Sequence, residues 1–204
     1  MAQIRPYARG DLPALYEICL KTGDSGGDAT HLYADPRIIG DIYAAPYAAL
    51  QPDLALVVED GEGVAGYMIG TLDTAAFEAR QERDWWPALR EVYPDPKGVP
   101  GLERTPDQGR AARIHRPVAT PAPLVAAYPA HLHINLLPRL QGHGMGERLV
   151  TTWLELIRER GASGVHLGCN AGNHRALRFY DRYGFRRFPV DPPWPGTVWM
   201  VIDL

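Results

Sequence analysis

The chain has 204 residues, of which 46% are hydrophobic and 22% charged, as expected for one globular domain with a sizeable core. Its formal net charge of −3 excludes a global basic field that would attract nucleic acid or an anionic membrane. Two cysteines form no disulfide framework, and no stretch reaches the roughly 18 apolar residues of a membrane span, so we expect a cytoplasmic protein without a membrane partner.

The first part of the chain predicts a strand, two helices, a β-hairpin and a long helix. Asp60-Gly61-Glu62-Gly63 is typical of the hairpin turn, and Pro87 is expected to kink the long helix. The elements are expected at 3–6 (strand), 11–20 and 36–43 (helices), 54–59 and 64–72 (hairpin strands) and 75–92 (helix).

Residues 94–130 are rich in proline and glycine, with one helical segment near 106–115. Because ordered domains seldom contain so long a plain loop, we interpret this segment as an insertion or lid within a single domain, 1–204.

The second half predicts alternating strands and helices. They are expected at 131–137, 165–169, 185–188 and 198–202 (strands) and at 144–160 and 173–183 (helices). The resulting order, βα(α)ββα, insertion, βαβαββ, indicates a mixed α+β layer architecture.

A glycine-rich turn, Gln141-Gly142-His143-Gly144-Met145-Gly146, joins the strand at 131–137 to the amphipathic helix behind it. Backbone N–H groups at a helix N-terminus bind anions, and glycines leave room for a phosphate to approach them. The alternative is that Gly144 and Gly146 only permit close packing of helix and strand. A P-loop is disfavoured because no Gly-Lys-Ser/Thr follows the glycines.

Two motifs carry a family resemblance. Leu136-x-Pro138-x-x-Gln141-x-x-Gly144-x-Gly146 and Asn173-x-x-Ala176-x-x-x-Tyr180-x-x-x-Gly184-Phe185 resemble the acyl-CoA loop and the following helix of the GNAT superfamily of N-acetyltransferases.

The first half resembles a more particular domain. Gly40-Asp41-Ile42-Tyr43-Ala44-Ala45-Pro46-Tyr47 and Gly66-Tyr67-x-x-Gly70-Thr71-Leu72-Asp73 are similar to the acetyltransferase-like domain at the C-terminus of eukaryotic O-GlcNAc hydrolases. The chain contains no glycosidase portion, so it resembles a free-standing bacterial relative of that domain.

The resemblance implies a GNAT fold, with a mixed, mostly antiparallel sheet that splays at the acyl-CoA strand and helices on both faces. It also implies a bulge in that strand and acetyl-CoA as co-substrate. Main-chain groups of 134–136 would meet the pantetheine arm and the thioester, and the amides after Gln141 would bind the pyrophosphate. The implied cofactor-binding residues are Ile134, Asn135, Leu136, Gln141, Gly142, His143, Gly144, Met145, Gly146, Glu147, Asn173 and Ala176.

Tyr180 is the first candidate for a chemical role, because the matching tyrosine of the family protonates the departing CoA thiolate. The alternative is an aromatic residue on a core-facing helix stripe. Asn173 either caps the helix or bonds the cofactor.

The general base is less clearly marked. The position where many members carry a glutamate is Gly168, which cannot titrate. His131 and His133 share one strand face, and His133 is the preferred base; Asp73, at the end of the hairpin strand, is the other candidate. The alternatives are hydrogen-bonded strand histidines and a helix N-cap.

The resulting hypothesis is an N-acetyltransferase acting on an amine of a small molecule or protein; the alternative is an acetyl-CoA-binding pseudoenzyme that serves as a sensor or interaction module. We expect no metal, because no histidine or cysteine spacing resembles a zinc site. A monomer and a homodimer stay equally open. Residues expected near the acceptor are Asp24, Asp28, Tyr33, Tyr43, Tyr47, Trp85 and Trp86.

Overall fold

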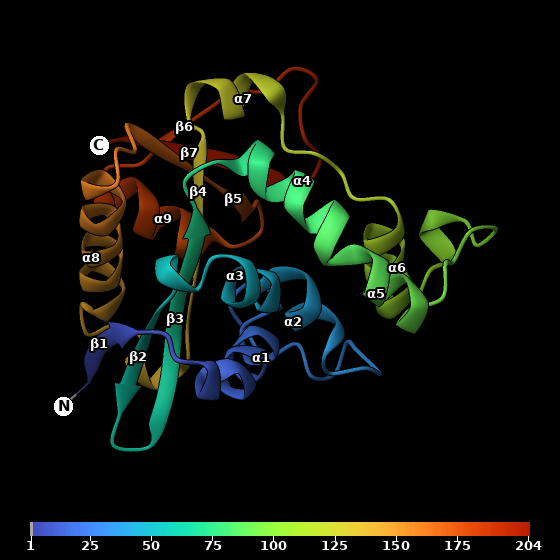
Figure 1. Cartoon of the computed structure of the whole chain (residues 1–204), viewed down its shortest axis with the longest axis horizontal. Helices are drawn as coiled ribbons and strands as arrows, with labels where there is room; N and C mark the ends of the chain where they lie inside the picture. The colour runs from blue at the N-terminus through green and yellow to red at the C-terminus, as the bar shows by residue number, and fades with distance from the viewer. Residues whose placement is uncertain (1) are drawn as a thin grey trace.

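The computed structural model describes residues 2–204 and builds them around one seven-stranded sheet (Figure 1). The strands are Gln3–Pro6 (β1), Leu56–Asp60 (β2), Gly63–Thr71 (β3), Ala130–Leu136 (β4), Gly164–Asn170 (β5), Arg186–Arg187 (β6) and Thr197–Asp203 (β7). They lie in the order β1-β2-β3-β4-β5-β7-β6, and every neighbouring pair is antiparallel except β4 and β5.

The parallel pair is very short. β4 and β5 are paired only at Ala130↔Val165 and His131↔His166, and beyond His131 they separate. The predicted splay of a mixed, mostly antiparallel sheet is therefore confirmed.

The predicted bulge in β4 is wrong. β4 pairs with β3 in an unbroken register from His131 to Leu136, and β5 pairs with β7 without interruption. The sheet therefore parts as two regular halves, and β4 needs no extra residue to diverge from β5. The register shift in this sheet lies between β2 and β3, at Val58 and Glu59.

Nine helices surround the sheet within residues 2–204. They are Leu12–Lys21 (α1), Ile38–Tyr43 (α2), Ala45–Leu50 (α3), Thr74–Asp84 (α4), Trp86–Val92 (α5), Pro106–His115 (α6), Ala122–Ala127 (α7), Met145–Glu159 (α8) and His174–Tyr183 (α9).

The two faces of the sheet bury different helices. Because side chains alternate along a strand, Val57 and Ile69 pack with α1 to α3, whereas Val58 and Met68 pack with α8. Figure 1 shows α8 and α9 on one side of the sheet and α1, α2 and α3 on the other. Helices on both faces were expected, and the prediction is confirmed.

Most predicted boundaries hold within two residues, and those of β1 and α6 coincide with the expected ranges. The long helix 75–92 is divided at Trp85, because Pro87 lies in the first turn of α5 and cannot continue the preceding helix. Two short helices, α3 and α7, were missed, although Pro46 and Pro123 mark their first turns.

The segment 94–130 is partly built into the core. Ala111 and Ile114 of α6 pack in the same hydrophobic cluster as the buried residues of α1 and α2, and Ile114 is fully buried. Its function as a lid stays a prediction. In the part of the chain from residue 2 onward, no helix is long and apolar enough to cross a membrane.

Gly70 of β3 offers a test of this packing. A Cβ at Gly70 would lie 2.2 Å from the His131 carbonyl oxygen and 2.4 Å from Cζ2 of Trp153. Trp153 cannot swing away freely, because its Nε1 donates to the Leu54 carbonyl at 2.8 Å. We expect Gly70→Ala to lower the free energy of unfolding by about 3 kcal/mol. Urea denaturation measures the change. Gly61→Ala, where a Cβ meets nothing within 4 Å, is the control, and equal stability of the two variants would contradict the packing.

Candidate active site

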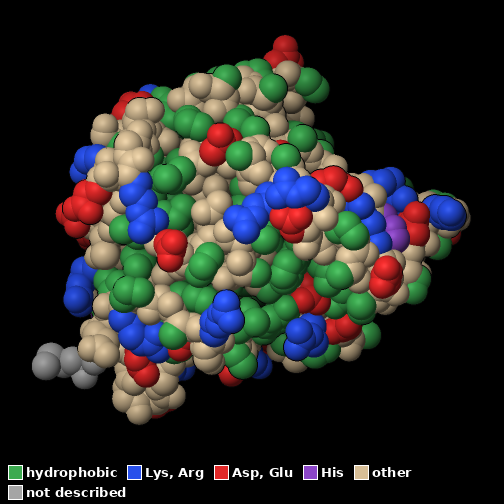
Figure 2. All heavy atoms as spheres, in the orientation of Figure 1, with side chains coloured by type: hydrophobic (Ala, Val, Ile, Leu, Met, Phe, Trp, Pro, Cys, Tyr) green, Lys and Arg blue, Asp and Glu red, His purple; other side chains and the backbone are tan. Residues whose placement is uncertain are grey.

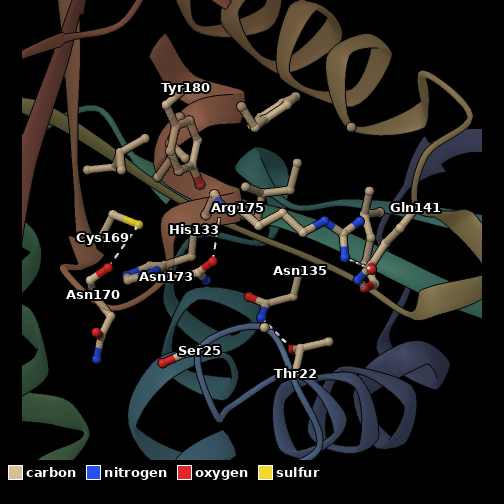
Figure 3. Close-up of a pocket in the computed structure, with 18 of the residues that line it drawn as sticks. Thr22, Ser25, His133, Asn135, Gln141, Cys169, Asn170, Asn173, Arg175 and Tyr180 are labelled. Carbon is tan, nitrogen blue, oxygen red and sulfur yellow. Dashed lines mark hydrogen bonds between the residues drawn. The ribbon is translucent and has the colours of Figure 1, made fainter. Parts of the chain in front are cut away.

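Where β4 and β5 separate, the sheet opens on a cavity of about 600 Å³, which we call the splay cavity (Figure 3). This volume lies within the range of small-molecule sites. Ten of the twelve predicted cofactor residues line it: Ile134, Asn135, Leu136, Gln141, Gly142, Gly144, Gly146, Glu147, Asn173 and Ala176.

The other two predicted cofactor residues do not line the cavity. The His143 side chain is exposed, and Met145 is buried in the core that α8 covers. Met145 could therefore contact a ligand only through its backbone.

The glycines of the turn are required by backbone conformation. Gly142 and Gly144 have φ of +82° and +74°, a left-handed region that other residues rarely adopt. A Cβ on either would meet nothing within 4 Å, and one at Gly146 would make only ordinary contacts of 3.5 Å. Close packing between helix and strand therefore does not explain these glycines, and open space lies in front of them.

The start of α8 faces the same cavity. Gly144 is its N-cap residue, and no side chain caps the first turn. The first N–H groups of a helix lack partners within the helix and carry a partial positive charge, so this turn can accept an anion.

Gln141 holds the turn in place. Its Nε2 donates to the Leu136 carbonyl at 2.6 Å, and its Oε1 accepts from Arg175 of α9 (Figure 3). Gln141 therefore ties the end of β4 to α9. Arg175 and Arg182, both on α9 and seven residues apart, bring two cations to the cavity that sequence reasoning missed.

A second group of contacts closes the opposite wall. Asn135 Nδ2 donates to Thr22 Oγ1 at 2.5 Å, and Ser25 and Gly26 also line the cavity (Figure 3). Asn173 accepts from the Ala176 amide at 3.0 Å, so it caps α9 while facing the cavity.

Tyr180 lies on α9 with its hydroxyl toward the splay cavity (Figure 3). Only 8% of the residue is exposed. Burial raises the pKa of its phenol far above the usual value, because the phenolate would lose its hydration. The hydroxyl therefore keeps its proton at neutral pH, and Tyr180 is a core aromatic residue whose protonated hydroxyl faces the cavity.

A second cavity of about 340 Å³ lies at the same opening, and we call it the outer cavity. The residues that line both cavities are Leu132, His133, Leu167 and Gly168. Among these four, His133 alone has a titratable side chain.

His131 and His133 share one face of β4, as predicted, with ring centroids 5.8 Å apart. His133 Nε2 lies 3.0 Å from the Tyr47 hydroxyl, whose oxygen is 2.6 Å from His131 Nε2. Burial, with the positive charge of Arg113 as second cause, lowers the pKa of His133 to about 4. His133 is therefore neutral at pH 7 and able to accept a proton.

The prediction of Asp73 as a base is wrong in geometry. Its carboxylate accepts from the Ala76 amide at 2.9 Å, which makes it the N-cap of α4, and its side chain is exposed and lines neither cavity. At Gly168, a Cβ would lie 3.0 Å from the Trp199 ring, so that ring already occupies the room a longer side chain would need.

The residues expected near the acceptor divide into two groups. Tyr43, Tyr47 and Trp86 line the outer cavity. The remaining four line neither cavity: Asp24, Asp28, Tyr33 and Trp85.

Sequence reasoning missed many residues that line the outer cavity, among them Glu78, Glu82, Arg113 and Trp199. Glu78 Oε1 already accepts from the amide and hydroxyl of Thr120. The available signals were the charges of Glu78 and Arg113 on the helices predicted at 75–92 and 106–115.

Acidic and basic side chains alternate over the face in Figure 2, with no patch of one sign. Residues 2–204 contain no group of three or more histidine, cysteine or acidic side chains placed to hold a metal.

A sheet that parts between two parallel strands, with a glycine turn and a helix N-terminus at the opening, defines a GNAT fold. Residues 118–185 match the acetyltransferase (GNAT) family. The crystal structure of SsHAT is 40% identical, with a TM-score of 0.89, and the match covers 99% of this chain and 98% of that one. The chain therefore belongs to the GNAT acetyltransferase family.

Two curated relatives are much longer than the matched region. Protein O-GlcNAcase of Rattus norvegicus is 25% identical over 181 residues, which make up 89% of this chain and 20% of that protein. Mycothiol acetyltransferase of Rhodococcus jostii is 27% identical over 194 residues, 92% of this chain and 62% of that protein. The PaiA N-acetyltransferase of Thermoplasma acidophilum, solved with coenzyme A, shares the fold, with a TM-score of 0.60 at 13% identity.

The buried histidines predict how stability depends on pH. Burial lowers the pKa of His133 and His166 to about 4, and that of His131 well below its usual value. The unfolded chain binds these protons near pH 6.5, so stability is complete above that pH and falls as the pH drops toward 4. We expect a loss of about 1.4 kcal/mol per pH unit for each such histidine. Urea denaturation between pH 7.5 and 4.5 measures it; His166→Gln reduces the slope, and a flat profile would contradict neutral burial.

Proposed function

We propose that this protein is an acetyl-CoA-dependent N-acetyltransferase that moves an acetyl group to a primary amine. The observation that carries the proposal is the meeting of two cavities at His133, one with the features of a CoA site and one with aromatic and charged walls. Family membership supports acetyl transfer, and the solved neighbour with coenzyme A supports the co-substrate.

The splay cavity fits acetyl-CoA. The amides from Gly142 to Glu147 and the helix N-terminus would bind the pyrophosphate, with Arg175 and Arg182 supplying positive charge. Main-chain groups of β4 at 134–136 that face the cavity would bond the pantetheine arm, and apolar Leu136 and Phe179 would pack against it.

The reaction follows from the two cavities. An amine in the outer cavity attacks the thioester carbonyl carbon; the C–N bond forms, the C–S bond breaks and the electron pair leaves with sulfur. A main-chain N–H of β4 would stabilise the charge that develops on the carbonyl oxygen. Tyr180 donates its proton to the thiolate, and His133 takes a proton from the amine. Solvent then returns a proton to Tyr180 and accepts the one held by His133.

The pseudoenzyme alternative has one observation in its favour. No carboxylate lines both cavities, and a histidine whose pKa lies near 4 is a weak base. Calorimetry with acetyl-CoA, followed by thiol release over a panel of amines and peptides, separates the two. Binding without turnover on any acceptor would favour the sensor, and absence of binding at millimolar acetyl-CoA would exclude both.

Gly144 provides a matched test of the CoA site. Gly144 precedes α8 and Gly161 follows it, both have positive φ, and a Cβ on either meets open space. We expect Gly144→Ala and Gly161→Ala each to lower the free energy of unfolding by about 1 kcal/mol. Only Gly144→Ala is expected to weaken acetyl-CoA binding, by about tenfold or more, in calorimetry. Equal affinity of both variants would place the pyrophosphate elsewhere.

Tyr180→Phe tests the proton donor. We expect kcat to fall about 100-fold, because the thiolate then leaves without a positioned acid, while the Kd for acetyl-CoA stays the same. Tyr183→Phe is the control: Tyr183 is on the same helix, its hydroxyl bonds Thr151 at 2.9 Å, and it lines neither cavity. Unchanged turnover in Tyr180→Phe would remove the tyrosine from the chemistry.

A further inference from the structure

A continuous hydrogen-bond network runs from the Pro129 carbonyl, just before β4 in the sequence, to His133. Thr74 Oγ1 lies 2.7 Å from the Pro129 carbonyl oxygen and 2.7 Å from His131 Nδ1. His131 Nε2 lies 2.6 Å from the Tyr47 oxygen, which lies 3.0 Å from His133 Nε2. The first three side chains are buried, with Thr74 fully covered and Tyr47 and His131 5% and 8% exposed.

One arrangement of protons satisfies both contacts of the Thr74 hydroxyl. Two oxygens 2.7 Å apart need a proton between them, and a carbonyl oxygen cannot donate, so the single proton of Thr74 goes to Pro129, whose oxygen also accepts from the Thr74 amide at 2.8 Å. The Thr74 oxygen must then accept from His131, which places the His131 proton on Nδ1. Because burial keeps His131 neutral, its Nε2 carries only a lone pair.

The positions of the protons on Tyr47 and His133 follow from those on Thr74 and His131. Tyr47 donates its single proton to His131 Nε2, and burial keeps the phenol protonated by raising its pKa. The Tyr47 oxygen therefore accepts from His133 Nε2–H. The remaining nitrogen, His133 Nδ1, carries a lone pair and has no hydrogen-bond partner among residues 2–204, yet it is not a buried orphan atom.

We propose that Thr74, His131 and Tyr47 are positioning residues that lock His133 in the tautomer with Nε2 protonated, leaving the Nδ1 lone pair as the atom that removes the proton from the acceptor amine. The inference rests on the proposed N-acetyltransferase function. In this step an amine N–H bond breaks and the Nδ1–H bond forms.

The lock suits a base in a buried site. When Nδ1 takes up the proton, Nε2 still donates to Tyr47, so the chain needs no rearrangement in either protonation state. Without Tyr47 and His131, a neutral imidazole would divide between two tautomers, and only one of them presents a lone pair at Nδ1.

Several groups face His133 and set how it titrates. Arg113 of α6 and His166 of β5 oppose its protonation electrostatically. Around them lie the ring of Tyr43 at 6.5 Å, that of His131 at 5.8 Å, the Tyr47 hydroxyl, and Glu78 in the same outer cavity.

The direct test reads the tautomers. Long-range ¹H–¹⁵N correlations of the full ¹⁵N-labelled chain at pH 7 report which ring nitrogen carries each proton. We expect the proton of His131 on Nδ1 and that of His133 on Nε2. In Tyr47→Phe we expect a His133 signal that reports both tautomers. His133 protonated on Nδ1 in the unmodified chain, or an unchanged His133 signal in Tyr47→Phe, would overturn the inference whether or not the protein turns over.

Kinetics test the consequence. Tyr47→Phe keeps the ring that stacks on Phe77 at 4.5 Å, and we expect it to lower kcat about tenfold to 100-fold with an unchanged Kd for acetyl-CoA. Thr74→Val is expected to lower kcat as well, whereas Thr74→Ser, which keeps the hydroxyl, restores it. Tyr128→Phe, which removes the hydroxyl of another buried tyrosine that lines neither cavity, is the control.

The outcomes separate the two proposals. If the protein releases no CoA thiol with any amine, the proposed function is contradicted. The NMR spectrum would still show whether His133 is held in one tautomer. Full turnover in Tyr47→Phe, with the tautomers mixed, would show that the lock does not serve the reaction.

Discussion

β4 and β5 share only two parallel residue pairs, and the geometry of the whole site depends on how short that contact is. Backbone N–H and C=O groups within a sheet are normally paired, and an unpaired buried group is costly. By separating after His131, the two strands leave a row of main-chain groups that face a cavity rather than each other. Regular pairing of β4 with β3 and of β5 with β7 keeps that opening rigid.

The two cavities at this opening are lined by different charged groups. Arg175, Arg182 and the uncapped start of α8 bring positive charge to the splay cavity, which suits phosphates, and Glu147 is the one carboxylate among those of residues 2–204 that line it. The outer cavity instead contains Glu78 and Arg113 beside aromatic rings. His133 lies between these environments, and its burial explains why it stays neutral.

The lack of a carboxylate at Gly168 has a structural counterpart. The Trp199 ring covers that position, and polar side chains gather instead on the neighbouring strand and on the helices that pack against it. In the mechanism that we propose, four residues from three parts of the chain take the place of a single acidic group: Tyr47, Thr74, His131 and His133. Such an arrangement depends on direction as well as distance, because each hydroxyl and each neutral imidazole has one proton to donate.

The sequence alone determined the local features of this protein. The left-handed glycines of the turn, the Asn173 cap, the helix break before Pro87 and most of the order of strands and helices follow from residues a few positions apart. Backbone preference and hydrophobic period therefore indicate them, with the short helices α3 and α7 as exceptions. Family motifs then indicated the splay and the CoA loop.

Only the tertiary structure decided which side chains meet. Tyr47 lies 84 and 86 positions from its two histidine partners, and Thr74 lies 57 positions from His131. Asp73 and Thr74 are adjacent in the sequence, yet one caps a helix in solvent and the other is buried in the hydrogen-bond chain. Contacts of this kind depend on strand register and on how helices pack against the sheet, and no local preference encodes them.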